Sequence, residues 1–154
     1  MLDNREDTAL PDPKEKPAVN GAAKSSPETQ GNEKKRILIV DDVLVMRLRL
    51  RTQLEDAGFM VFEAEDGEKA LRLLTDIPGM HLIVTDVSMP VMDGIEFIRR
   101  LRKTKDYASI PVIVCTAKGE FSIVRQAKQL GVQGFLVKPI AKPTLLSVIK
   151  RELA

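Results

Sequence analysis

The stretch Ile37-Leu38-Ile39-Val40-Asp41-Asp42 decides the fold, because it joins a short run of branched apolar residues to two adjacent carboxylates. An apolar run of this length, uninterrupted by polar residues, is typical of a parallel strand that is buried on both faces. The helical pattern over 46–57 that follows has its apolar residues on one face and ends at Gly58. Together these residues predict one βα unit.

The same alternation of strand and helix recurs four more times between residue 59 and the end of the chain. The predicted strands lie at 59–62, 82–84, 112–115 and 135–137, and the predicted helices at 66–74, 94–101, 123–130 and 145–153. Five βα units in series imply a parallel sheet that is covered by helices on both faces. We therefore predict an α/β fold with a doubly wound five-stranded sheet in the order 2-1-3-4-5.

The first part of the chain differs in composition from the rest. Residues 1–36 contain 14 charged residues and 4 prolines but only 8 apolar residues, and none is aromatic. Such a segment buries too little apolar surface to offset an ordering entropy of about 1–2 kcal/mol per residue. We therefore predict a disordered N-terminal extension over residues 1–35 and one folded domain over residues 36–154.

Composition excludes several classes of protein and of site. No apolar run reaches the roughly 18–20 residues that cross a bilayer, so we expect no membrane segment. The first residues lack the pattern of a signal peptide, and one cysteine with one histidine provides neither a disulfide nor a multi-histidine metal site. We therefore expect a cytoplasmic protein. Because the net charge is only +2 and the predicted helices end with the chain, we expect no output domain and no direct DNA binding.

Polar side chains follow the predicted strands at the edge of the sheet where ligands bind in this class of fold. Asp41 and Asp42 follow the first strand and Asp86 follows the third, and these strands are neighbours in the predicted order. Three converging carboxylates repel one another, and a hard cation with oxygen ligands removes that repulsion. The sequence therefore predicts a Mg²⁺ site formed by these aspartates.

Phosphoryl transfer is the chemistry that this edge favours. Thr116 follows the fourth strand and Lys138 the fifth. Three aspartates, one lysine and Mg²⁺ have no net charge, so a phosphoryl group can approach without strong repulsion. A carboxylate is a competent phosphoryl acceptor, and the transfer depends mainly on positioning and on stabilising charge.

From Arg36 to Ala154, the chain resembles the receiver domain of bacterial two-component response regulators, which has a flavodoxin-like fold. Within that family it is similar to the chemotaxis-type single-domain regulators. The motifs that carry the resemblance occur in order at the strand ends: Ile37-Leu38-Ile39-Val40-Asp41-Asp42, Asp86-Val87-Ser88-Met89-Pro90, Met92-Asp93-Gly94, Thr116-Ala117 and Lys138-Pro139. Each motif is weak alone, and the ordered set is specific.

The resemblance implies a role for each metal-site residue. Asp86 corresponds to the aspartate that accepts the phosphoryl group. Asp41, Asp42, Asp86 and the backbone carbonyl of Ser88 correspond to the Mg²⁺ ligands. In contrast, Asp93 is interpreted as the N-cap of the helix that begins at residue 94.

The resemblance also implies phosphate-binding and switch residues. Thr116, Ala117 and Lys138 correspond to the groups that bind the phosphoryl oxygens, and Thr116 and Phe135 to the switch pair. The family often has tyrosine at the position of Phe135, so this chain lacks the ring hydroxyl. The bond before Pro139 corresponds to a cis peptide.

These implied roles predict a signalling switch, not an enzyme that turns over an external substrate. Asp86 is expected to receive a phosphoryl group from a sensor histidine kinase or phosphotransfer protein in a Mg²⁺-dependent reaction. The face formed by the fourth helix, fifth strand and fifth helix is then expected to bind a downstream protein. Two alternatives remain: a receiver-like interaction module that works without phosphorylation, and a phosphatase-type enzyme on the same fold class.

Overall fold

The computed structural model describes residues 33–154 of the chain. The extension that the sequence predicts over 1–35 therefore falls, up to residue 32, outside the described residues. From Lys34 to Ala154 the contacts define one structural unit.

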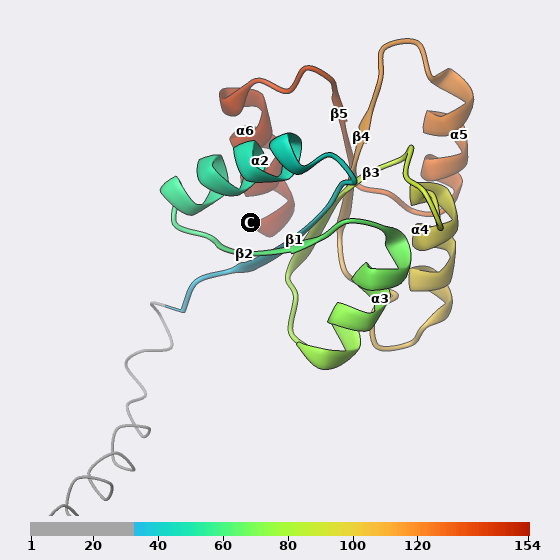
Figure 1. The fold of residues 1–154 in the computed structure, drawn as a ribbon, viewed down its shortest axis with the longest axis horizontal. Helices are drawn as coiled ribbons and strands as arrows, with labels where there is room; N and C mark the ends of the chain where they lie inside the picture. Colours follow the sequence, from blue (N-terminus) through green and yellow to red (C-terminus); the bar gives the residue numbers. More distant parts are fainter. Residues whose placement is uncertain (1–32) are drawn as a thin grey trace, which may run out of the picture. The chain divides into compact units, whose positions relative to one another are not determined.

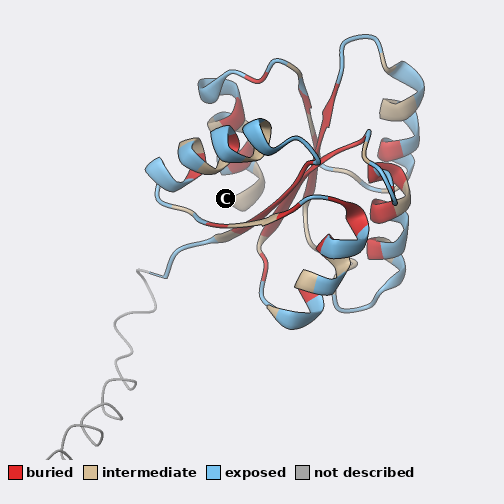
Figure 2. Ribbon diagram, in the orientation of Figure 1, coloured by how far each residue is buried: buried red, intermediate tan, exposed pale blue. Residues whose placement is uncertain are grey.

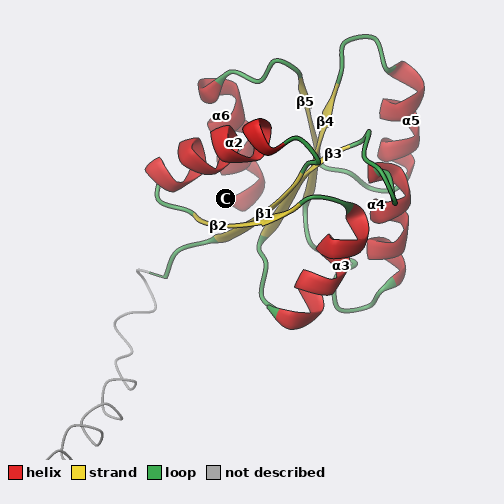
Figure 3. Cartoon of the chain, viewed as in Figure 1, coloured by secondary structure: helices red, strands yellow, loops and turns green. Residues whose placement is uncertain are grey.

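Five strands alternate with five helices in the described residues (Figures 1 and 3). The strands are β1 (Arg36–Val40), β2 (Met60–Ala64), β3 (Leu82–Asp86), β4 (Val112–Thr116) and β5 (Gly134–Val137). The helices are α2 (Leu44–Asp56), α3 (Gly67–Asp76), α4 (Gly94–Lys103), α5 (Phe121–Gln129) and α6 (Lys142–Leu153).

The sheet has the strand order β2-β1-β3-β4-β5, and every pair of neighbours is parallel. This confirms the predicted doubly wound α/β fold. The order puts β1 between β2 and β3, so the carboxyl ends of β1 and β3 lie side by side. That adjacency places the two acidic segments next to each other.

Two apolar layers cover the two faces of the sheet. Successive side chains of a strand point to opposite faces, so β1 contributes Ile37 and Ile39 to one layer and Leu38 and Val40 to the other. The first layer packs against α2 and α6, and the second against α3, α4 and α5. The buried residues follow the strands and the inner sides of the helices (Figure 2). Both faces of the sheet are therefore covered, and the polar residues discussed below lie at its carboxyl edge.

The sequence predicts the second strand at 59–62, whereas β2 spans Met60–Ala64 and so begins one residue later and ends two residues later. The amide of Phe59 donates to the Leu54 carbonyl at 3.1 Å, so Phe59 closes the end of α2 and does not join the sheet. Gly58 allows this closure, because its φ of 97° lies in the left-handed region that glycine adopts without strain.

The helices begin in two different ways. The Asp66 side chain accepts from the Lys69 amide and the Asp93 side chain from the Glu96 amide, so α3 and α4 have side-chain caps. This confirms the interpretation of Asp93 as an N-cap. In α2, however, the N-cap is Val43, which offers no capping side chain. The segment that joins β1 to α2 must therefore be held by other contacts.

No helix in the described part of the chain is both long and apolar enough to cross a membrane.

Candidate functional site

The three aspartates predicted to form a metal site converge at the carboxyl edge of the sheet. One carboxylate oxygen from each of Asp41, Asp42 and Asp86 lies within 4.8 Å of the other two. Asp41 and Asp42 follow β1, and Asp86 is the last residue of β3. The parallel pairing of these strands, in which Val40 is opposite Thr85, brings the two segments together.

Asp41 is the most deeply buried of the three. It is only 2% exposed, and its Oδ1 accepts the Val43 amide at 2.9 Å. Burial raises the pKa of the Asp41 carboxyl above its ordinary value of 3.8, and the negative charges of Asp86 and Asp42 add to this. The Val43 hydrogen bond and the Lys138 charge oppose the rise without cancelling it. A bound cation would relieve this cost, because it stabilises the ionised carboxylate.

Asp86 has one occupied carboxylate oxygen and one free one. Its Oδ1 accepts the Val87 amide at 2.8 Å and lies 3.1 Å from the Lys138 Nζ. Its Oδ2 accepts no hydrogen bond among residues 33–154. Asp42 is exposed and its carboxylate likewise makes no such contact in the described chain. The site thus offers unpaired oxygen atoms beside a fixed lysine.

Lys138 is the cation of this site. Its Nζ lies 3.1 Å from Asp86 and 3.8 Å from Asp41, and its side chain is 28% exposed. Burial is the largest single influence and lowers the pKa of Lys138, but the hydrogen bond and charges of the two aspartates outweigh it, so the pKa is raised. The ammonium is therefore firmly protonated. The bond between Lys138 and Pro139 is cis.

Two further groups predicted to bind phosphate lie at the end of β4. Thr116 is 2% exposed, and its hydroxyl makes no hydrogen bond within the described residues. The Ala117 amide donates to the Glu120 carboxylate at 2.7 Å, so this N–H is already occupied. Sequence reasoning missed Glu120. The available signal is Gly119, whose φ of 88° at the third position of a four-residue turn brings residue 120 back to residue 117.

Ser88 and Phe135 complete the set of predicted residues. Ser88 is exposed in the loop after β3, and its carbonyl accepts no hydrogen bond in the described part of the chain. Phe135 is half-buried on β5 and packs against the apolar layer beneath α3, α4 and α5. The Lys128 Nζ lies 5.9 Å from the centre of its ring. The structure thus brings together the aspartates and Lys138, whereas Phe135 belongs to the flank of the domain.

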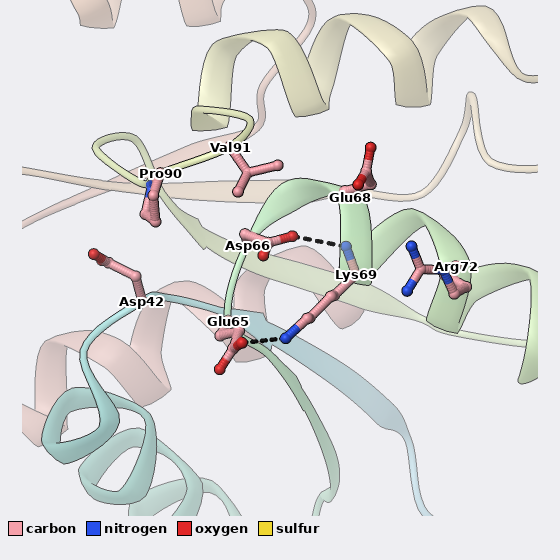
Figure 4. Close-up of a pocket in the computed structure, with 8 residues that line it drawn as sticks. All are labelled: Asp42, Glu65, Asp66, Glu68, Lys69, Arg72, Pro90 and Val91. Atoms are coloured by element: carbon pink, nitrogen blue, oxygen red, sulfur yellow. Dashed lines mark hydrogen bonds and ion pairs between the residues drawn. The ribbon is translucent and has the colours of Figure 1, made fainter.

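A cleft of about 490 Å³ opens beside Asp42 (Figure 4). It is lined by Asp42, Glu65, Asp66, Glu68, Lys69, Arg72, Pro90 and Val91. Figure 4 shows Asp42 on one side of this cleft and the first turns of α3 on the other. The rim residue Val91 has a φ of 67°, which is a strained conformation for a β-branched side chain. Asp42, which the sequence predicts as a metal ligand, is exposed and borders this cleft.

The fold and this acidic edge define the receiver class of α/β proteins, and comparison with known proteins agrees. The family model for the response regulator receiver domain matches residues 37–150. The chain belongs to the response regulator receiver family.

Among its relatives are chemotaxis proteins. A probable chemotaxis protein CheY of Rhizobium etli is 36% identical over 119 residues, which cover 77% of this chain and 92% of that protein. The chemotaxis protein CheY-3 of Vibrio cholerae is 37% identical over 115 residues, which cover 74% of this chain and 88% of the relative.

Solved structures give the same result. The chemotaxis response regulator CheY4 of Vibrio cholerae matches with a TM-score of 0.74 and 34% identity, covering 79% of this chain and 100% of that one. The receiver domain of a signal transduction histidine kinase from Syntrophus aciditrophicus matches with a TM-score of 0.72 and 34% identity, covering 77% and 89% of the two chains. The chain is thus a CheY-like receiver domain of flavodoxin-like fold.

Proposed function

We propose that this protein is a phosphorylation-activated signalling switch in which Asp86 accepts a phosphoryl group from a phosphohistidine of a sensor kinase or phosphotransfer protein. The observation that carries this proposal is the arrangement of the Asp86 carboxylate. Lys138 and the Val87 amide hold Oδ1, while Oδ2 accepts no hydrogen bond among the described residues. A carboxylate held by one oxygen presents the other as an oriented nucleophile.

The donor set supports Mg²⁺ as the metal of this site. Asp41, Asp42 and Asp86 supply carboxylate oxygens within 4.8 Å of one another, and the free carbonyl of Ser88 is a further oxygen donor. Hard oxygen ligands of this kind suit Mg²⁺, which keeps several waters and binds through few protein groups. When bound, the ion would neutralise charge on the phosphoryl oxygens. Receiver domains bind Mg²⁺ at such an acidic pocket, which agrees with this donor set.

The transfer step exchanges one bond to phosphorus for another. The free oxygen of Asp86 forms a bond to phosphorus, while the bond between phosphorus and the donor imidazole nitrogen breaks. The electron pair of that bond stays on the imidazole, which takes up a proton. Lys138 keeps its proton throughout and stabilises the negative phosphoryl oxygens, since its pKa is raised by the aspartates.

Two groups at the end of β4 are candidates to bind the transferred phosphoryl group. The Thr116 hydroxyl has no hydrogen bond among the described residues and is free to donate. The Ala117 amide becomes a donor only after it releases Glu120. Phosphorylation would therefore move Glu120, the N-cap residue that directly precedes α5. This links the phosphorylation site to a helix of the proposed output face.

The proposed partner surfaces lie on two sides of the site. On α2 and just before it, Val43, Leu44, Val45 and Leu48 are 47–65% exposed, which supports docking of the phosphoryl donor beside Asp42. On the face formed by α5, β5 and α6, Phe121 is 77% and Val137 53% exposed. We infer that this second face binds the downstream protein, and that residues 36–154 form the receiver after an extension over 1–35.

The two alternative functions have less support. A phosphatase of this fold class would use two aspartates separated by one residue after the first strand, whereas Asp41 and Asp42 are adjacent. An interaction module that works without phosphorylation would not need the cluster of Asp41, Asp42, Asp86 and Lys138 to stay intact.

Intact-mass measurement with a small phosphodonor tests the proposal. The protein is incubated with acetyl phosphate and Mg²⁺, and the expected result is one phosphoryl adduct that disappears in Asp86→Asn and in the presence of a chelator. Asp93→Asn is the matched control, because asparagine also caps a helix and Asp93 lies outside the cluster. An unmodified mass in the wild type, or an adduct that persists in Asp86→Asn, would contradict the proposal.

A further inference from the structure

Arg47 of α2 bridges the segment that carries Asp41 and Asp42 to strand β2. Its Nη1 donates to the Asp41 carbonyl at 2.7 Å, and its Nε donates to the Glu63 carboxylate at 3.1 Å. The side chains of Arg47 and Glu63 are 13% and 18% exposed, so both contacts are largely shielded from water. This pair lies outside the cluster of carboxylates and next to it.

The Asp41 carbonyl is the group that sets the direction of Asp42. It belongs to the peptide that joins Asp41 to Asp42, and a peptide is planar, so holding its oxygen fixes the plane from which Asp42 extends. The other polar groups of Asp41 already have partners, since its amide donates to the Ala64 carbonyl and its Oδ1 accepts the Val43 amide. Arg47 supplies the missing contact on the side that faces Asp42.

The start of α2 holds this segment through one further contact, since the Val43 amide reaches back across Asp42 to the Asp41 Oδ1 at 2.9 Å. The N-cap Val43 provides no capping side chain, and among residues 33–154 Arg47 is the side chain that donates to the Asp41 carbonyl. The Asp42 side chain is exposed and makes no hydrogen bond among residues 33–154. The direction of its carboxylate therefore depends on the backbone around it, where Arg47 holds the Asp41 carbonyl and the Asp41 side chain holds the Val43 amide.

Glu63 in turn keeps Arg47 in its orientation. A guanidinium is a rigid planar fork, so binding Glu63 through Nε points Nη1 at the carbonyl. Burial alone would raise the pKa of Glu63, but hydrogen bonds from Arg51 and Arg47 lower it below its ordinary value, so the carboxylate remains charged. Arg51 also binds Glu63, but it does not contact the Asp41 carbonyl.

We propose that Arg47 is a positioning residue for the Mg²⁺ site, holding the Asp41–Asp42 peptide so that the Asp42 carboxylate faces Asp41 and Asp86. This inference rests on the proposed function, since that function supplies the need for Mg²⁺. The direction in which Mg²⁺ affinity changes when Arg47 is removed distinguishes a positioning role from an effect of its positive charge. A nearby positive charge repels a cation, so if Arg47 acted only through its charge, its removal would tighten Mg²⁺ binding.

Calorimetric titration of Mg²⁺ into the unphosphorylated protein tests the proposal. We expect Arg47→Gln to raise the Mg²⁺ dissociation constant by about tenfold, the usual effect of removing a group that orients a metal ligand. Arg51→Gln is the matched control, because it also removes one positive charge and one arginine that binds Glu63. The Mg²⁺ dissociation constant of this variant should stay at or below the wild-type value. Urea unfolding in a chelator measures the stability of each variant without metal.

Three outcomes decide between the possibilities. Unchanged or tighter Mg²⁺ binding by a folded Arg47→Gln overturns the role of Arg47 while leaving the proposed function intact. Absence of Mg²⁺ binding by the wild type overturns both. If Arg47→Gln does not fold, Arg47→Lys decides, since it keeps the charge but cannot bind both acceptors through a planar fork. Weaker binding by this variant supports positioning, and wild-type binding overturns it.

Discussion

At the carboxyl ends of the strands three aspartates lie close together and two of them pair with one lysine, whereas near the amino ends of β4 and β5 one arginine is surrounded by acceptors. Arg102 donates to the carbonyls of Leu130, Ala108, Ile110 and Gly131 and to the Gln133 side chain, at 2.8–3.4 Å. At the other edge, Asp42 and the second oxygen of Asp86 have no such partner in the described chain. At the amino-end edge the charge of Arg102 has several hydrogen-bond partners. At the carboxyl edge the Asp42 carboxylate has none among the described residues and can bind a ligand.

The difference shows how one sheet separates stability from chemistry. Arg102 is partly buried, and a charge of this kind with several hydrogen bonds joins the segments that provide its acceptors. Like charges held together without partners cost stability, and they are retained where a ligand compensates for them. We therefore expect substitutions at the two edges to affect different measurements.

The largest effect is expected at Gly94, where one substitution should reduce both stability and phosphorylation. An added Cβ would overlap the Asp86 carbonyl oxygen and lie 2.8 Å from the Val87 Cα, and neither backbone atom can yield easily. We expect Gly94→Ala to destabilise the protein by at least about 3 kcal/mol in urea unfolding and to abolish the phosphoryl adduct.

Gly67→Ala is the matched control, since Gly67 begins α3 as Gly94 begins α4. Its Cβ would lie 2.9 Å from the Met92 sulfur and 3.0 Å from the Phe97 Cβ, which are side-chain atoms and not backbone atoms. The loss of stability should be clearly smaller. Equal losses for the two variants would show that backbone contact at Asp86 is not the cause.

Arg102→Met is expected to lower stability without changing the metal site. The loss of several charge-assisted hydrogen bonds should cost about 2–3 kcal/mol of unfolding free energy, while Mg²⁺ affinity stays at the wild-type value. Arg100→Met on the same helix removes only an exposed pair with Glu96, and should cost less than about 1 kcal/mol. A change in Mg²⁺ affinity in Arg102→Met would break the proposed separation of the two edges.

Glu120→Gln is expected to have the opposite profile, with a change in phosphorylation at constant stability. The neutral side chain competes less strongly for the Ala117 amide and removes a negative charge beside the incoming phosphoryl group. We expect the phosphorylated fraction at a limiting donor concentration to rise about fivefold, roughly the effect of weakening one charge-assisted hydrogen bond. Glu55→Gln, with the same charge change at the far end of α2, should match the wild type; a similar rise there would indicate a general charge effect.

The smallest expected effect is a change in acid sensitivity through Glu63. Its folded-state pKa is depressed below 4.5, so its contribution to stability is present above about pH 4.5 and is lost as the pH falls through the folded pKa. The urea midpoint of the wild type should therefore fall more steeply below pH 4.5 than that of Glu63→Gln. Parallel acid limbs for the two proteins would show that the pairs with Arg47 and Arg51 contribute nothing.

Much of the fold could be predicted because its signals are local. Runs such as Ile37–Val40 and Val112–Cys115 indicate buried strands, and the helical periodicity between them implies crossovers of one hand. Five such units fit the doubly wound order 2-1-3-4-5, and in that order Asp41, Asp42 and Asp86 lie at one edge. The start of β2 was misplaced because Phe59 is apolar but closes a helix, a choice that depends on hydrogen bonding and not on hydropathy.

The sequence by itself determined the number and order of the elements, the parallel sheet and the acidic cluster at its carboxyl edge, since periodicity and strand-end position depend on neighbours along the chain. Only the tertiary structure decided that Arg47 holds the Asp41 carbonyl, that Glu120 occupies the Ala117 amide and that Arg102 joins three segments. Arginine and glutamate side chains have many rotamers. Their partners are therefore chosen by the segments that folding brings within reach.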